Sequence, residues 1–187
     1  MANKPRAFVV MGASGVGKTT IALGLAKHFD GTFIEGDDLH PAENIKAMSR
    51  GRPLTDDMRA PWLVSLGEAI AIQRSETEKM IFATCSALKR DYRDTLRAQV
   101  PDLVFLCLEA GEKSIRARLN TRSDHFMPAA LLTSQLETFE PLTDDENHLT
   151  IETDGTADEV IAKAIKALTS EPFSQPPSIH SPSGQNA

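Results

Sequence analysis

Long apolar runs, cysteines and blocks of basic residues are scarce in this sequence of 187 residues. No stretch approaches the roughly 18 apolar residues that a membrane-spanning helix requires. The short apolar run near the start leads straight into a glycine-rich loop, without a signal-peptide cleavage site. The net charge of -6 and the lack of a long Lys/Arg block argue against a surface that wraps nucleic acid. We therefore expect a cytoplasmic protein that binds neither a membrane nor nucleic acid.

The two cysteines, Cys85 and Cys107, lie within or at the ends of apolar segments. Buried free thiols in a reducing compartment occupy such positions, so we expect no disulfide. The histidines show no Cys/His spacing typical of a zinc site. At this length one hydrophobic core accounts for nearly the whole chain, and a single domain is expected over residues 1–170. Residues 171–187 are rich in Pro, Ser, Gly and Gln, which predicts a disordered tail.

Short apolar segments alternate with stretches of helical periodicity along the chain. The predicted strands are residues 6–11, 32–35, 79–84, 102–109 and 148–153. The predicted helices are residues 18–28, 60–75, 88–98, 112–121, 129–139 and 157–169. Strands without a polar face that alternate with helices indicate a five-stranded parallel sheet, covered by helices on both faces and joined by right-handed crossovers. The predicted fold class is α/β.

The first predicted strand runs into the segment GASGVGKT, which has the P-loop pattern and is followed by a predicted helix. Its glycines let backbone N–H groups turn toward an anion, and the helix N-terminus adds a positive dipole end. Lys18 is placed to reach the β- and γ-phosphates of ATP, and the Thr19 hydroxyl to ligate Mg²⁺. The residues predicted to bind nucleotide in this segment are Gly12, Ala13, Ser14, Gly15, Val16, Gly17, Lys18, Thr19 and Thr20.

A tight strand-to-helix turn with an incidental Lys and Thr is the alternative reading of this segment. The full pattern arises by chance on the order of once per hundred chains of this length, and its place after the first strand makes chance rarer. A GTPase would carry Asp-x-x-Gly and Asn-Lys-x-Asp motifs, and neither occurs. An ATP-driven motor would have a strand ending in Asp, whereas residues 102–109 end in Glu109. The pattern favours a small-molecule kinase.

A second polar cluster, EGDDLHP, follows the second predicted strand at residues 35–41. In open α/β sheets, ligands bind at the carboxyl ends of the strands. Asp37 is therefore a candidate to orient an acceptor hydroxyl and take its proton, with a water-mediated role at Mg²⁺. Helix capping is the alternative, because an Asp and Pro41 are typical of a helix start. Capping does not explain His40.

Three segments beyond the P-loop resemble the gluconate kinase family in order and spacing. They are GDDLHPAENIKAMSRGRPLTDDMRAPWL at residues 36–63, CSALKRDYRDTLR at 85–97 and RSDHFMPAALLTSQLETFEPL at 122–142. The resemblance covers roughly residues 6–168. It implies a shikimate-kinase-like P-loop fold, ATP-dependent phosphorylation of D-gluconate on its 6-hydroxyl, and a homodimer.

The resemblance also assigns acceptor-binding residues. It places Asp37 and His40 in the family's G-D-x-L-H-P motif, Arg59 in D-D-x-R-x-P-W-L, and Lys89 and Arg93 in C-S-A-L-K-x-x-Y-R. An anionic, hydroxyl-rich acceptor needs Arg or Lys for its carboxylate and Asp and His for its hydroxyls, which this set provides. The alternative for the three basic residues is a solvated helix face, the commoner position of a single charge.

The region around residues 116–140 is predicted to form a lid over the nucleotide. Arg118 and Arg122 share a helix face if the helix continues that far, and both are candidates to reach the phosphates. An exposed basic face is the alternative, and the resemblance favours Arg122 as the stronger candidate. Two positions depart from the family pattern. The family often has an aromatic residue at the position of Asp38 and a glycine at the position of Asp124. These departures leave open which acceptor the protein prefers and how the lid moves.

Two other functions remain open from the sequence. A kinase of another small polyol acid, or of shikimate, is compatible with the departure at Asp38. A nucleotide-binding regulator without kinase activity is the other, and the intact Lys18, Thr19 and Asp37 argue against it. By analogy of fold, the loop between the last strand and the last helix, residues 153–156, is a candidate neighbour of the adenine.

Overall fold

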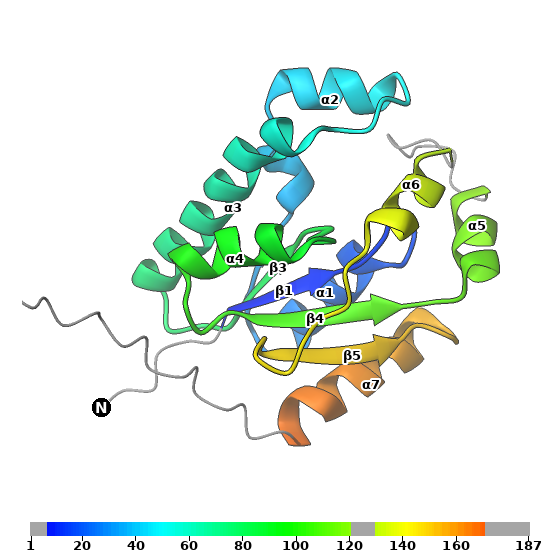
Figure 1. Cartoon of the computed structure of the whole chain (residues 1–187). Helices are drawn as coiled ribbons and strands as arrows, with labels where there is room; N and C mark the ends of the chain where they lie inside the picture. Colours follow the sequence, from blue (N-terminus) through cyan, green and yellow to red (C-terminus); the bar gives the residue numbers. More distant parts are fainter. Residues whose placement is uncertain (1–6, 121–129, 171–187) are drawn as a thin grey trace, which may run out of the picture.

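Five strands form one parallel sheet in the computed structural model, which describes residues 7–120 and 130–170 (Figure 1). The strand order is β2-β3-β1-β4-β5, and every neighbouring pair is parallel. The bounds are Ala7–Met11 for β1, Thr32–Ile34 for β2, Ile81–Thr84 for β3, Val104–Glu109 for β4 and His148–Glu152 for β5. The parallel five-stranded sheet predicted from the sequence is confirmed.

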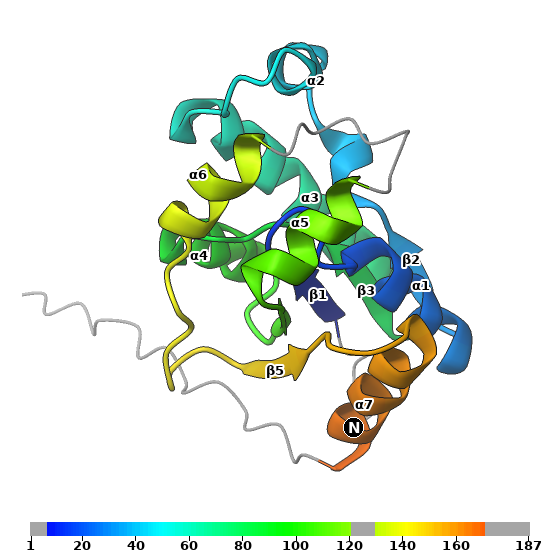
Figure 2. The same cartoon turned by 90° about the vertical axis from the view of Figure 1, so that its right-hand side faces the viewer.

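Helices connect the strands and cover both faces of the sheet (Figure 1). Their bounds are α1 Lys18–His28, α2 Ala42–Ser49, α3 Asp56–Glu76, α4 Arg90–Gln99, α5 Glu112–Asn120, α6 Ala130–Thr138 and α7 Ala157–Ser170, with a 3-10 helix, η1, at Gly36–Leu39. Helices α3 and α4 pack on one face and α1 and α7 on the other. Figure 2 looks onto the carboxyl ends of the strands, where α5 and α6 stand in front of the sheet.

Strand β1 supplies both halves of the core. Its residues alternate in direction, so Ala7, Val9 and Met11 join the core beside α3 and α4, while Phe8 and Val10 join the core beside α1 and α7. All five are buried. A strand that is buried on both faces has no polar side, which is why AFVVM shows no alternation in its sequence. This packing holds the P-loop, which follows β1, at the carboxyl edge of the sheet.

Helix α3 begins four residues before the predicted start, at Asp56. Thr55 is its N-cap and accepts a hydrogen bond from the backbone N–H of Met58, and the first turn is acidic. The cap and the acidic turn stabilise this start, and the helix continues through Pro61.

The segment between β2 and α3 also differs from its prediction. Asp37 and Asp38 lie in η1, and helix α2 begins at Ala42 with Pro41 as an N-cap that makes no side-chain capping bond. Capping of α2 therefore does not account for either aspartate. Helix α2 itself was not predicted from the sequence.

The two predicted free thiols are confirmed, since Cys85 and Cys107 are buried and unpaired. Burial raises the pKa of each thiol to about 12, so both are protonated near neutral pH. Within the described ranges, no helix combines the length and the apolar character needed to cross a membrane. Residues 121–129, which hold Arg122 and Asp124, lie outside the described residues, as does the predicted tail at 171–187.

Candidate active site

The loop between β1 and α1 has the backbone geometry of an anion cradle. Gly12, Gly15 and Gly17 all have positive φ, at 131°, 83° and 108°. A Cβ on Gly12 would lie 2.7 Å from the Leu108 carbonyl oxygen, so only glycine fits there. Helix α1 begins without a capping side chain or an acidic residue in its first turn. The N-terminus of α1 therefore offers its N–H groups and positive dipole end to an anion.

Lys18 and Thr19 lie at the junction of the loop with α1. The Lys18 ammonium donates to the carbonyl oxygens of Gly12 and Ala13, at 3.1 Å each, so its charge lies along the inner side of the loop. The Thr19 hydroxyl donates to Oε2 of Glu35 at 2.8 Å. Both side chains line one cleft of the molecule.

That cleft runs from the P-loop to the segments that follow β2 and β3 and to one side of α6. Its lining residues are Ser14, Gly15, Gly17, Lys18, Thr19, Glu35, Asp37, His40, Met48, Pro53, Leu54, Arg59, Trp62, Ser86, Leu88, Ser134, Gln135 and Thr138. It therefore brings together the predicted phosphate-binding residues and three of the predicted acceptor-binding residues: Asp37, His40 and Arg59.

Glu35 connects the P-loop to the central strands and was not assigned a role from the sequence. Its Oε1 accepts a short hydrogen bond from the Thr84 hydroxyl, while Oε2 accepts from Thr19. The Thr84 oxygen also accepts from the Gly36 N–H at 3.0 Å. A carboxylate beside the P-loop threonine places acidic oxygens near the position predicted for Mg²⁺. Its position at the carboxyl end of β2, two residues before Asp37, was the available signal.

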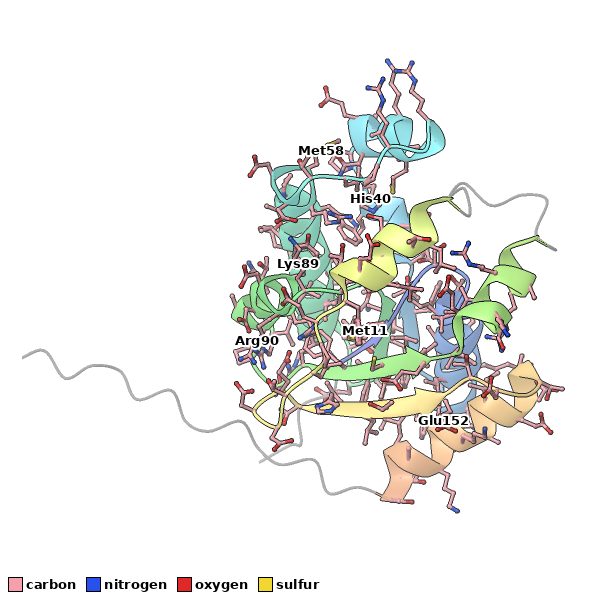
Figure 3. All side chains as sticks on the ribbon, turned by 45° about the vertical axis from the view of Figure 1, so that its right-hand side comes forward. Met11, His40, Met58, Lys89, Arg90 and Glu152 are labelled. Carbon is pink, nitrogen blue, oxygen red and sulfur yellow. The ribbon has the colours of Figure 1, made fainter. Side chains whose placement is uncertain are left out.

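His40 is buried in the wall of the cleft. Its ring stacks on Trp62 with centroids 4.0 Å apart, and its Nε2 lies 4.0 Å from Oδ1 of Asp37. Burial, together with the positive charge of Arg59, lowers the pKa of His40 to about 4. The imidazole is neutral near pH 7. Figure 3 shows His40 close to Met58, where α2 meets the start of α3.

Arg59 and Lys89 belong to one cluster around Asp56 and Tyr92. Arg59 donates to the Leu54 carbonyl and, at 3.3 Å, to the Tyr92 hydroxyl, and its guanidinium lies 5.5 Å from the Tyr92 ring centre. Lys89 donates to Asp56 at 2.7 Å and is not among the residues that line the cleft. This hydrogen bond lowers the pKa of the Asp56 carboxyl. The cluster holds two cations beside the acceptor end of the cleft.

Arg93 is placed elsewhere than predicted. Its side chain is 0% exposed, and its guanidinium pairs with Glu146 at 2.7 Å. The remaining donors bind backbone carbonyl oxygens of Ala87, Leu88, Glu140 and Pro141. Burial alone raises the pKa of Glu146, but the hydrogen bond and charge of Arg93 hold it below the usual value. Arg93 therefore supports the chain beneath the cleft and does not contact it.

A second hollow lies on the other side of the P-loop. It is lined by Gly15, Val16, Gly17, Thr20, Ile21, Arg118, Thr153, Gly155, Ala157 and Val160. Arg118 donates to the Val16 carbonyl at 3.3 Å and to the Thr153 hydroxyl at 3.1 Å. Arg118 and the β5–α7 loop, both predicted near the nucleotide, thus meet beside the P-loop.

Helix α6 contacts the P-loop through Gln135, a residue the sequence did not single out. The Ser14 backbone N–H donates to Oε1 of Gln135 at 2.7 Å. Arg116 of α5 donates to the Thr133 hydroxyl of α6 at 2.9 Å, which links the two helices. The described parts of the predicted lid, residues 116–120 and 130–140, therefore contact the P-loop through Arg118 and Gln135.

A phosphate cradle that opens onto the same cleft as an acidic acceptor residue, at the carboxyl edge of a parallel sheet, is the arrangement of a small P-loop kinase. A family model described as an AAA domain matches residues 8–142, which include the P-loop and the acceptor segments.

Similar proteins show to which family of small P-loop kinases the chain belongs. The gluconokinase of Gluconobacter oxydans (strain 621H) is 43% identical over 171 residues, 91% of this chain and 96% of that protein. A gluconokinase structure from Sinorhizobium meliloti 1021 has a TM-score of 0.79 at 40% identity and covers 89% of this chain and 93% of its own. An unliganded sugar kinase from Janibacter sp. HTCC2649 has a TM-score of 0.82 at 45% identity, with coverages of 88% and 95%. The chain belongs to the gluconokinase family.

Proposed function

We propose that this protein transfers the γ-phosphoryl group of ATP to the 6-hydroxyl of D-gluconate and releases 6-phospho-D-gluconate and ADP. One observation carries the proposal: in a chain of the gluconokinase family, Lys18 and Thr19 line the same cleft as Asp37, His40 and Arg59. Groups for the phosphoryl donor and groups for the acceptor therefore meet in one place, as an in-line transfer requires.

The donor side of the mechanism uses the P-loop. Its N–H groups and the start of α1 bind the phosphates, and Lys18 stabilises the oxygens of the transferred group. Arg118 adds a cation beside the loop, and Arg122 has the same proposed role on the strength of the resemblance. The hollow lined by Thr153 and Gly155 is the proposed place of the adenosine.

The residues present fit a Mg²⁺ ion bound together with ATP. Hard cations take hydroxyl and carboxylate oxygens, and the Thr19 hydroxyl lies 2.8 Å from the Glu35 carboxylate on the wall of the cleft that Asp37 also lines. Thr19 would hold the ion directly and Asp37 through a water molecule. When bound, Mg²⁺ neutralises negative charge on the phosphates.

The acceptor side orients gluconate and receives a proton. Asp37 holds the 6-hydroxyl in line and takes its proton late in the transfer, because the transition state is loose and the attacking oxygen gains little bonding early. His40, which lines the cleft next to Asp37, also binds the hydroxyls of the acceptor. Arg59 and Lys89 form the cationic end for the carboxylate of gluconate, a role for which a guanidinium is well shaped.

Several broader features belong to the same proposal. Residues 1–170 form one kinase domain in which a lid around residues 116–140 closes over the nucleotide. The contacts of Arg118 with Val16 and of Gln135 with Ser14 support this lid, since they join its two helices to the P-loop. A homodimer in the cytoplasm, with ATP and Mg²⁺ as cosubstrate and cofactor, completes the proposed description.

A coupled assay for ADP release tests the function. The purified protein is given ATP, Mg²⁺ and one acceptor at a time: D-gluconate, other sugar acids or shikimate. ADP release should depend on gluconate, and the product should carry its phosphate on the 6-hydroxyl. A preference for another polyol acid or for shikimate would overturn the acceptor, and ADP release that rises with none of them would favour a regulator without kinase activity.

A further inference from the structure

Packing fixes the ring of His40 in one orientation. The imidazole stacks on Trp62 with an interplanar angle of 19°. Trp62 is itself held, because its Nε1 donates to the Gly36 carbonyl oxygen at 2.7 Å. His40 is 8% exposed and its neighbour Asn44 is 3% exposed. The polar edges of the ring therefore face defined partners.

Asn44 determines the hydrogen-bond polarity of one ring edge. Its Nδ2 donates to the Met58 carbonyl oxygen at 2.8 Å and lies 3.2 Å from Nδ1 of His40. A carbonyl oxygen only accepts hydrogen bonds, so the atom that faces Met58 has to be the amide nitrogen. The same nitrogen presents its second hydrogen to Nδ1, which must accept. A neutral imidazole that accepts at Nδ1 carries its proton on Nε2.

The protonated ring does not fit these contacts. An imidazolium would bring an Nδ1–H against the N–H of Asn44, two donors facing each other. In the part of the chain that the structure describes, the charged groups that act on the ring are Asp37 of η1 and Arg59 of α3. The neutral form is also the one that the lowered pKa of His40 favours.

We propose that Asn44 is a positioning residue that holds His40 as its Nε2–H tautomer, so that His40 and Asp37 bind one acceptor hydroxyl with its proton directed toward Asp37. Nε2 and Oδ1 of Asp37 are 4.0 Å apart, and both residues line the cleft. A hydroxyl oxygen within hydrogen-bond distance of both atoms accepts from Nε2–H and donates to the carboxylate. With the other tautomer both partners would be acceptors, and one hydroxyl proton cannot satisfy both. The identity of this acceptor rests on the proposed function.

Nuclear magnetic resonance of the histidine ring tests the tautomer directly. The full-length protein is labelled with ¹³C and ¹⁵N in histidine, and the His40 signals are assigned by their loss in His40→Gln. The resting wild type near pH 7 should show the Nε2–H form. An Nδ1–H ring or an imidazolium would overturn the proposal. The measurement uses no substrate, so its result stands whether or not gluconate proves to be the acceptor.

A variant that cannot donate tests the role of Asn44. Asn44→Leu keeps a similar volume and should lower kcat/KM for gluconate roughly tenfold, with KM for ATP unchanged, since one oriented hydrogen bond to the acceptor is lost. The His40 tautomer signature should change in the same variant. Ile45→Ala, at the exposed neighbouring position on α2, is the matched control and should leave both readouts unchanged.

A double-mutant cycle separates positioning from a merely structural role. If Asn44 acts through His40, Asn44→Leu should cause no further loss of kcat/KM in a His40→Gln background. An equal loss in both backgrounds would show that Asn44 only ties α2 to α3 through Met58, and would overturn the proposal. Should Asn44→Leu fail to fold, the wild-type spectrum still decides the tautomer.

Discussion

The two halves of the cleft are built in opposite ways. The phosphate half comes from one continuous segment, residues 12–19, whose backbone supplies most of the polar groups. The acceptor half is assembled from η1, α2, α3 and the segment that follows β3, and its groups are side chains held by other side chains: His40 by Asn44 and Trp62, Arg59 by Tyr92. A backbone site depends on chain conformation, whereas a side-chain site depends on each of its supports.

The largest effect is expected in the phosphate half, at the P-loop residue Lys18. Lys18→Met should lower kcat/KM about 10³-fold, because a preorganised positive group near the transferred phosphoryl oxygens is lost. Steady-state kinetics with saturating gluconate measures it. Lys27→Met, at the exposed end of the same helix, should leave the rate unchanged. A loss of less than tenfold would place the phosphates away from Lys18.

A large effect confined to chemistry is expected in the acceptor half. Asp37→Asn should lower kcat about 10²-fold while the affinity for ATP survives, because the amide cannot take the hydroxyl proton. Single-turnover kinetics and nucleotide titration separate the two quantities. Asp38→Asn, next to it and outside the cleft lining, is the control. Unchanged turnover in Asp37→Asn would remove the residue from its proposed role.

Arg93 sharpens the comparison because it supports the acceptor half without belonging to it. Arg93→Met should lower the free energy of unfolding by about 3–5 kcal/mol, since the buried Glu146 would lose its closest cation and keep only the more distant Arg90. Urea denaturation measures the change. Arg97→Met, which breaks a more exposed pair with Asp94 on the same helix, should cost at most about 1 kcal/mol. Weaker gluconate binding at unchanged stability would instead indicate that Arg93 binds the substrate in the cleft.

The smallest effect is expected where the carboxylate of the acceptor binds. Arg59→Gln should raise KM for gluconate roughly tenfold, the loss of one charge-assisted hydrogen bond, with KM for ATP unchanged. Initial rates at varied gluconate and fixed ATP show the split. Arg52→Gln, an exposed residue shortly before α3, provides the comparison. An equal rise in both KM values would mean that Arg59 shapes the whole cleft.

The features that sequence alone could predict are those that depend on a short, continuous segment of the chain. The strands and the P-loop are local patterns, and the structure has them where they were expected. The pairing of Arg93 with Glu146 spans 53 residues, so it could not be read locally. One signal was present: Arg93 and Leu96 of α4 and Val100, the residue that caps it, follow helical spacing, and all three are buried. A charged residue among the apolar residues of one helix face indicates that it is buried with a partner of opposite charge.

Contacts between distant segments account for the other omissions. Gln135 reaches Ser14 across 121 positions of sequence, and Glu35 meets Thr84 across 49. Nothing in the local composition of α6 distinguishes Gln135 from other polar residues of a helix. Asn44 was overlooked for a different reason, since α2 is short and was not among the predicted helices. The acceptor half was located by the position of Asp37 and His40 at the end of a strand and by resemblance, and its internal supports emerged only from the packing.

Trp62 has a practical consequence, because the sequence contains a single tryptophan. Its indole stacks on His40 and lines the cleft, so all tryptophan emission of the protein originates beside the acceptor site. Fluorescence therefore reports on one half of the cleft without any label. Titrating gluconate without ATP measures gluconate binding next to Trp62. Titrating ATP without gluconate shows whether ATP binding changes the surroundings of Trp62.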